Sequence, residues 1–227
     1  MRLTCLVPNF LWHATQPLKF GPIPLSSRMT VVRLQDGRLW VHSPISPTRD
    51  LVDELQAIGP VGYVIAPNRF HHLFFAEFLA AHPSAQGYVA PGLHSKRPDL
   101  KHCPTLPAAA PWSDELDAVF IDGLPLVNET VWFHRASGTL IVTDLLFCFS
   151  QDQGGFVRFV AKLLGVYGNL GMSRTEKLCI RDKAAFRASV ARLLSMPVQR
   201  IVLAHDQVIE EKCSERLVKA FAWLQQG

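Results

Sequence analysis

The sequence predicts an α+β fold in which two β-sheets pack face to face and helices cover their outer surfaces, an αββα four-layer sandwich. Two hairpins support this fold, because apolar runs flank Asp36-Gly37 and residues 136–138, and such turns join antiparallel strands. The order of elements alternates these hairpins with helical patterns, so helices are available for both outer faces. No GxGxxG motif follows the first strand, which disfavours a doubly wound dinucleotide-binding sheet.

The individual elements follow from the spacing of the apolar residues. The expected strands are residues 3–7, the two runs within 29–44, 61–66, 88–90, 116–121, the two runs within 131–147, and 199–204. The expected helices are residues 48–57, 71–82, 153–166, 182–196 and 211–225. The proline-rich residues 1–27 predict an irregular arm, and residues 91–114, with five prolines, predict a loop. We expect one domain over residues 1–227, in which the helical segment 150–195 covers a site.

Composition limits the partners that the protein can have. With 227 residues, 48% hydrophobic and 19% charged, the chain is long and apolar enough for a sizeable core. The net charge of +4 comes from scattered residues, so we expect no nucleic-acid partner. No apolar stretch reaches the length of a membrane span, and the N-terminus lacks a signal-peptide pattern. The five widely spaced cysteines favour free thiols and a cytoplasmic location.

Three strand ends carry residues that can bind a metal. His71 and His72 follow the apolar run VGYVIA, Asp144 ends the run LIVTD, and His205 ends the run IVLAH. The carboxyl ends of strands in α/β sheets are where catalytic groups gather. A histidine alone would more often be structural, but this combination predicts a metal site.

At these residues the chain resembles the metallo-β-lactamase superfamily, in particular a divergent bacterial branch. The resemblance lies in RMTVVRLQDGRLWVHSP, VGYVIAPNRFHHLF, the hairpin NETVWFH…TLIVTDL, and IVLAHD. It covers most of residues 28–148 and returns at 197–209, whereas 150–195 matches no motif of the superfamily. The resemblance implies an αββα fold and a metal-dependent hydrolase.

The metal motif of the superfamily, HxHxDH followed by a distant His, a bridging Asp and a final His, is degenerate here. Its two leading histidines fall on Pro67 and Arg69, so the first metal site is lost, and its distant His falls near Asn128 or Glu129. The resemblance implies that the second site survives as His71, His72, Asp144 and His205. This set suits one divalent metal ion, zinc foremost and Fe²⁺ or Mn²⁺ as alternatives. Asp206 stands where the superfamily usually has glycine.

Other residues receive roles from this comparison. The Arg69 guanidinium could replace the missing cation and bind an anionic group of a small-molecule substrate, and His42 could contact the substrate. Asp144 or Glu129 would orient water and accept its proton. Each has a plainer structural interpretation: Glu129 as a turn residue, Asp144 as a cap after its strand, and His71 as a partner of the loop after Pro67.

The leading interpretation is therefore a single-metal hydrolase acting on an ester, amide, thioester or phosphoester. The alternatives are an iron-dependent redox enzyme and a non-catalytic, metal-free binding or interaction module. The sequence leaves open whether the protein is a monomer or a homodimer, and whether residues 91–114 or 150–180 form the roof of the pocket.

Overall fold

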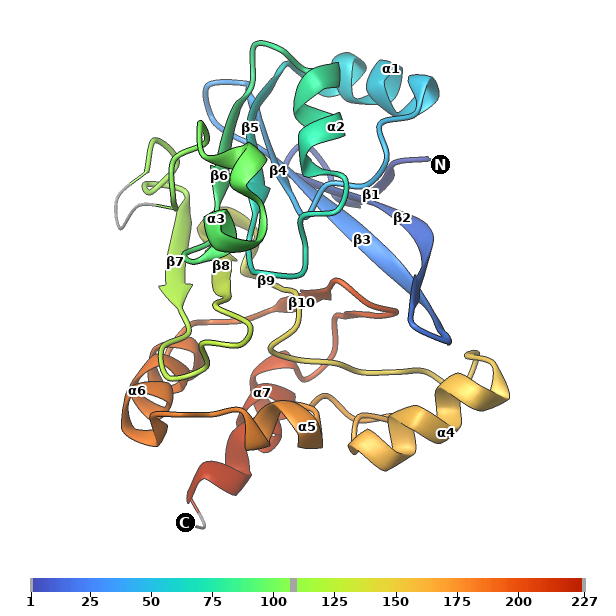
Figure 1. Cartoon of the computed structure of the whole chain (residues 1–227), viewed down its shortest axis with the longest axis vertical. Coiled ribbons are helices and arrows are strands. Elements are labelled where there is room, and N and C mark those ends of the chain that lie inside the picture. The colour runs from blue at the N-terminus through green and yellow to red at the C-terminus, as the bar shows by residue number, and fades with distance from the viewer. Residues whose placement is uncertain (1, 107–109, 226–227) are drawn as a thin grey trace.

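Two mixed β-sheets and seven α-helices form the computed structural model of the chain, which describes residues 2–106 and 110–225 (Figure 1). Residues 107–109 of the expected 91–114 loop, and the ends of the expected 1–227 domain, lie outside the described residues. The predicted α+β class and αββα layering are confirmed. None of the helices in the described part of the chain is both long and apolar enough to cross a bilayer.

The first sheet contains the strands of the N-terminal half in sequential order. Its strands are β1 (Thr4–Val7), β2 (Leu11–Phe20), β3 (Ile23–Arg33), β4 (Leu39–His42), β5 (Val61–Ala66) and β6 (Gln86–Val89). The predicted hairpin around Asp36-Gly37 is confirmed, because β3 and β4 pair antiparallel. In the rest of this sheet, β4, β5 and β6 pair parallel. The helices α1 (Arg49–Ile58) and α2 (Phe75–Ala81) pack on this sheet through one apolar cluster.

The second sheet has the order β11-β10-β9-β8-β7. Its strands are β7 (Leu116–Phe120), β8 (Thr130–His134), β9 (Thr139–Val142), β10 (Arg200–Leu203) and β11 (Val208–Ile209). The predicted hairpin at 136–138 is confirmed as the antiparallel pair β8–β9. Strands β9 and β10 are parallel neighbours, with Val142 opposite Leu203. This pairing places the chain after β9 beside the chain after β10.

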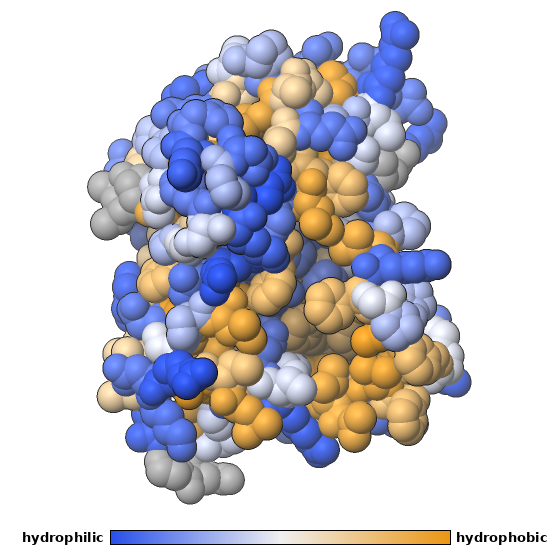
Figure 2. All heavy atoms as spheres, viewed as in Figure 1, coloured by the Kyte–Doolittle hydropathy of each residue, from blue (hydrophilic) through white to orange (hydrophobic). Residues whose placement is uncertain are grey.

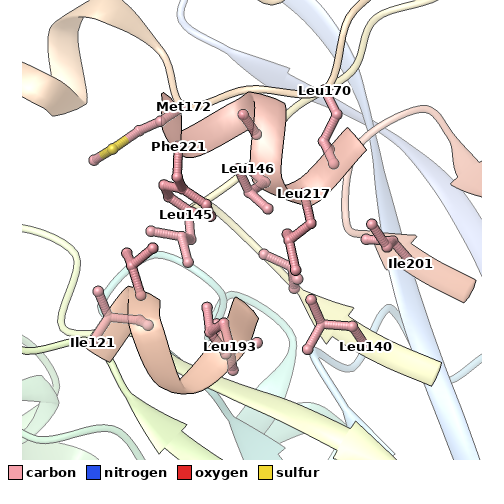
Figure 3. Packing of buried hydrophobic residues seen from close by; sticks show 14 of the residues in the cluster. Ile121, Leu140, Leu145, Leu146, Leu170, Met172, Leu193, Ile201, Leu217 and Phe221 are labelled. Atoms are coloured by element: carbon pink, nitrogen blue, oxygen red, sulfur yellow. The ribbon is translucent and has the colours of Figure 1, made fainter. Parts of the chain in front are cut away.

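Apolar side chains fill the spaces between these layers. A cluster that contains Trp40, Tyr63, Trp132 and Val202 draws residues from both sheets and lies between them. The outer face of the second sheet packs on α6 (Lys183–Leu194) and α7 (Cys213–Phe221). Figure 3 shows this packing, with Leu193 and Leu217 directed toward Leu140 and Ile201. The short elements are α3 (Leu93–Lys96), η1 (Pro98–Leu100), η2 (Arg135–Ser137) and η3 (Ala222–Gln225).

The predicted irregular arm over residues 1–27 is wrong, because most of these residues belong to β1, β2 and β3. Its prolines are compatible with strands for a specific reason. Pro17 lies where β2 extends beyond its pairing with β1, and Pro24 lies where β3 extends beyond its pairing with β4. Proline is tolerated at such strand edges because the missing N–H has no ladder partner.

One further local prediction is wrong, that of the helix start after β5. The helix expected from residue 71 begins only at Phe75, because the Asn68 side chain accepts hydrogen bonds from the backbone N–H groups of Phe70 and His71 and forms a turn there. His134, at the end of β8, is fully buried. Its ring packs against Phe10, and its Nδ1 lies 2.8 Å from the Ser137 hydroxyl.

The expected helical segment 150–195 contains three helices with different surroundings. The helix α4 (Gly155–Leu164) and the short helix α5 (Arg174–Leu178) contribute residues to a cavity, whereas α6 packs against the outer face of the second sheet. Figure 1 shows α4 beside the tip of the β2–β3 hairpin. Part of this segment therefore contributes to the walls of the cavity.

Candidate metal centre

Three predicted ligands converge because of the strands that precede them. His71 lies in the turn after β5, and Asp144 and His205 each lie two residues beyond the paired residues Val142 and Leu203. The two parallel strands thus deliver the carboxylate and one imidazole to the same place. The atoms of His71, Asp144 and His205 that could bind a metal ion all lie within 4.8 Å of one another. We refer to these three residues as the metal group.

The distances within this group match those of a tetrahedral metal site. Nε2 of His71 lies 3.3 Å from Nε2 of His205, and each of these nitrogens lies 3.4 Å from Oδ1 of Asp144. An ion about 2.0–2.1 Å from tetrahedrally arranged ligands separates neighbouring ligand atoms by about 3.3 Å. The three atoms can therefore bind one ion with little movement.

Hydrogen bonds on the far side of each ring orient the histidines. Nδ1 of His205 lies 2.6 Å from the backbone carbonyl oxygen of Ser26. Because a carbonyl oxygen only accepts, we infer that Nδ1 carries a proton and that Nε2 is the ring nitrogen available to a metal ion. Nδ1 of His71 lies 2.6 Å from the Ser43 hydroxyl, which can accept its proton in the same way. Such partners are typical of metal-bound imidazoles.

Asp144 is held by two buried polar residues. Nδ2 of Asn68 donates to Oδ2 of Asp144 at 2.6 Å, while Oδ1 of Asn68 accepts from the backbone of the His71 turn. Glu129 accepts hydrogen bonds from three consecutive backbone N–H groups, those of Thr143, Asp144 and Leu145, at 2.7–2.9 Å. The sequence presented Glu129 as a turn residue or catalytic base, but these bonds make it a positioning residue for Asp144. No sequence motif indicated the role of Asn68.

The electrostatics of the group favour an ionised Asp144. Burial by itself would raise the pKa of Asp144, but the adjacent His71 and His205 rings lower it well below its usual range. Burial, and then the negative charge of Asp144, raise the pKa of Glu129 to about 7. The carboxylate of Asp144 thus faces two imidazole nitrogens as an anion, which is the form that binds a cation.

The loop after β10 depends on a buried arginine that the sequence analysis missed. The Arg28 guanidinium donates to the backbone carbonyls of Leu203, Asp206 and Gln207. Burial lowers the pKa of Arg28 to about 10. Asp206 has a φ of 66°, a left-handed conformation that Asp adopts more readily than most residues. This explains how Asp206 occupies a position where the superfamily usually has glycine.

His72, a predicted metal ligand, lies outside the group. Its Nδ1 is 3.1 Å from the Arg97 guanidinium, and its Nε2, buried, has no hydrogen-bond partner among the described residues. Burial, and then the positive charges of Lys96 and Arg97, lower the pKa of His72 to about 4. Consecutive residues in the turn point in different directions, so the structure places only the first of the two histidines beside Asp144.

Neither of the two residues predicted to bind substrate, Arg69 and His42, lines the cavity beside His71, Asp144 and His205. Arg69 donates to the carbonyl oxygen of Pro125 at 3.1 Å and does not belong to the described residues that line the cavity. Lys96 does line it, with its Nζ bonded to the carbonyl oxygen of Arg69 and 4.9 Å from the centre of the Phe70 ring. His42 is fully buried at the end of β4, stacked on Trp40. Burial, and then His71, lower the pKa of His42 to about 3.

A cavity of about 410 Å³ opens beside the metal group. His71, Asp144 and His205 are among its lining residues. Most other lining residues are apolar and come from the β2–β3 hairpin, the turn after β5, residues 147–149 and α4. Figure 2 shows apolar residues gathered over α4, at the lower right, around a hollow in the surface.

Glu176 is an acidic residue of this cavity that the sequence analysis missed. Ser173, at the N-cap of α5, accepts from the backbone N–H of Glu176 and donates to its Oε2 at 3.0 Å. This S-x-x-E capping box is visible in the sequence. Burial, and then the negative charge of Asp144, raise the pKa of Glu176 to about 9, so the group is a carboxylic acid at neutral pH.

Solved structures share this fold. A metallo-β-lactamase from Pontibacter korlensis superposes with a TM-score of 0.65 at 12% identity, covering 100% of this chain and 99% of that one. A fragment described as a diflavin flavoprotein from Nostoc sp. PCC 7120 gives 0.67 at 11% identity, with 99% and 96% covered. A metallo-β-lactamase from Erythrobacter litoralis gives 0.62 at 14% identity, with 99% and 96% covered. The fold is therefore that of the metallo-β-lactamases.

Sequence comparison adds a family assignment. None of the curated proteins matches the chain. The model of a family described as "Domain of unknown function (DUF4336)" matches residues 8–166. This match covers β2 to α4, including His71 and Asp144 but not His205. Because it spans most of the chain, the protein belongs to the DUF4336 family and has the metallo-β-lactamase fold.

Proposed function

We propose that the protein is a metal-dependent hydrolase that holds one divalent ion on His71, Asp144 and His205. The observation that carries this proposal is the triangle formed by Nε2 of His71, Nε2 of His205 and Oδ1 of Asp144, 3.3–3.4 Å on each side, beside a cavity. A divalent ion would stabilise the Asp144 carboxylate between the two imidazole nitrogens, as a proton on one of these nitrogens does in its absence. Two imidazoles and one carboxylate also leave room for water and substrate, as catalytic zinc sites require.

When bound, a divalent ion supplies a Lewis acid and lowers the pKa of water toward neutrality. The residues of the chain orient and screen this site. Ser26 and Ser43 fix the two imidazole rings, and Asn68 and Glu129 fix the Asp144 carboxylate. Glu176 also lines the cavity, and we propose that its carboxylic acid form donates a proton to the leaving group.

An iron-dependent redox enzyme is the second candidate, and one observation favours it. Two histidines and one carboxylate are also the ligand set of non-haem iron oxygenases. The identity of the bound ion separates the two candidates. Bound zinc would favour the hydrolase, because Zn²⁺ has no redox chemistry, whereas bound iron together with oxygen consumption would favour the redox enzyme.

Metal content tests the proposal directly. Untagged protein purified without chelator is analysed by inductively coupled plasma mass spectrometry beside His205→Ala and Asp144→Asn. His102→Ala, at an exposed histidine outside the group, is the matched control. We expect one Zn, Fe or Mn ion per chain in the wild type and control and a loss in the other two variants. A wild type that stays metal-free when offered all three ions overturns the proposal and leaves the metal-free binding module.

A further inference from the structure

The cavity has an apolar wall that begins at the metal group. The Phe147 ring stacks on the His205 ring with a centroid distance of 5.9 Å and an interplanar angle of 7°. The Phe149 ring stacks in turn on Phe147, at 6.1 Å and 12°. Phe149 then joins a cluster with Val157 and Ala161 of α4. A continuous run of apolar side chains thus leads away from His205.

This apolar wall is held in a fixed position. The segment that carries both phenylalanines is extended, so the side chains of Phe147 and Phe149 lie on the same face. Its backbone bonds to a neighbouring segment at two points: the N–H of Phe147 donates to Gly171, and the N–H of Phe149 donates to Val166, each at 2.9 Å. The wall therefore exists before any ligand binds.

The remaining lining adds apolar surface and few charges. The β2–β3 hairpin contributes Leu18, Phe20, Ile23 and Leu25, and α4 contributes Val160 and Leu164. The lysines that line the cavity are Lys19 and Lys96, and Lys96 already bonds to a backbone carbonyl. Asp144 and Glu176 supply acidic groups beside the metal group. A mostly apolar lining cannot replace the hydration of a phosphate group, whereas it suits a neutral carbonyl compound that carries a hydrocarbon chain.

We propose that the cavity binds the linear hydrocarbon chain of a fatty acyl ester or thioester, with the acyl carbonyl beside His71, Asp144 and His205. The substrate class rests on the proposed hydrolase function. In the reaction, water adds to the carbonyl carbon and the C–O or C–S bond breaks. The alcohol or thiol leaves with one proton, and the acyl chain leaves as a carboxylic acid. A cavity of 410 Å³ is in the range of small-molecule sites, about 300–1,000 Å³.

A chain-length series tests this substrate class. The wild-type holoenzyme is assayed with the p-nitrophenyl esters of acetate, butyrate, octanoate and dodecanoate. Because each buried methylene contributes a roughly constant increment, we expect kcat/KM to rise about threefold per methylene until the cavity is filled. Measurable hydrolysis without dependence on chain length overturns the acyl-chain proposal and leaves the hydrolase. No hydrolysis of any ester counts against the hydrolase.

Variants on α4 locate the chain. Val160 lines the cavity and is half-buried, so Val160→Trp fills part of it without opening the core. We expect this variant to lower kcat/KM for dodecanoate about tenfold and to leave acetate almost unchanged. Phe159→Trp is the matched control, because Phe159 is exposed on the same helix and outside the cavity lining. Equal losses for both esters, or equal effects of both variants, contradict the proposed location.

Direct binding separates the chain site from catalysis. Dodecanoate is titrated calorimetrically into the wild type, His205→Ala and Val160→Trp. We expect binding to the first two and a loss of affinity of about tenfold in Val160→Trp. Dodecanoate binding by a protein that hydrolyses no ester supports the chain site while the proposed hydrolase fails. Absence of binding to the wild type overturns the acyl-chain proposal.

Discussion

The polar cluster and the apolar wall border one cavity but are built on different principles. The polar cluster is defined here as Asn68, His71, Glu129, Asp144 and His205. Glu129 immediately precedes β8, the other members follow β5, β9 or β10, and every member has a hydrogen-bond partner. The apolar wall is defined here as Phe147, Phe149, Val157 and Ala161. These residues come from the segment after β9 and from α4, and Ile23 and Leu25 of β3 pack against them. The polar residues thus occupy short loops whose positions are set by the strands beside them, whereas the apolar residues come from a helix, a strand and irregular segments.

The largest contrast is expected between the two adjacent histidines. His71→Ala should abolish stoichiometric metal binding, because it removes one of three converging ligand atoms. His72→Ala should retain the metal, because His72 faces Arg97 and lies outside the group. Metal content after dialysis, with circular dichroism to confirm folding, distinguishes the two. Metal loss in both variants would return His72 to the ligand set predicted from the sequence.

Glu129 should have the next largest effect. Its replacement by alanine leaves three buried backbone N–H groups without their acceptor, at about 1–3 kcal/mol each before relaxation. We expect the free energy of unfolding to fall by roughly 3–5 kcal/mol, measured by urea denaturation. Glu129→Gln, which keeps one acceptor oxygen, should lose less. A decrease below about 1 kcal/mol in Glu129→Ala would contradict the positioning role.

The sequence predicted the polar cluster better than the apolar wall for a physical reason. His71, Asp144 and His205 follow short apolar runs whose strand character is local, so their placement at strand ends could be inferred. The choice between His71 and His72 could not, because it depends on the turn that Asn68 closes. The sequence predicted that Arg69 binds substrate. Its guanidinium is instead oriented by a hydrogen bond to the backbone carbonyl of Pro125, a residue distant in the sequence.

The apolar wall lacked any comparable signal. The helical period of α4 was predicted, but that period does not reveal which residues face a cavity and which face solvent. The β2–β3 hairpin was interpreted as an arm because its prolines normally interrupt strands. They are tolerated only because the two strands extend past their other neighbours. Long-range pairing of this kind cannot be read from local composition.

A buried histidine without a carboxylate partner sharpens the contrast with the polar cluster. Burial lowers the pKa of His134 to about 4. Between about pH 6.5 and pH 4, His134 is therefore protonated in the unfolded chain but neutral in the folded chain. The contribution of His134 to stability is therefore full above about pH 6.5 and declines as the pH falls toward 4, by roughly 1–3 kcal/mol. Urea denaturation at about pH 7 and pH 5 should show a smaller decline for His134→Gln than for the wild type. Parallel declines would contradict this assignment.

The smallest effects are expected on the outer face of α4, and they define where the apolar wall ends. Phe159 is 65% exposed, whereas Val157, two residues earlier, is 4% exposed and packs on Phe149. Phe159→Ala should change the free energy of unfolding by less than about 0.5 kcal/mol, and Val157→Ala should lower it by roughly 1–2 kcal/mol. Urea denaturation of the two variants makes the comparison. A large loss in Phe159→Ala would mean that the outer face is covered in solution, for example by a second copy of the chain, and that its side chains contribute to stability as those of the wall do.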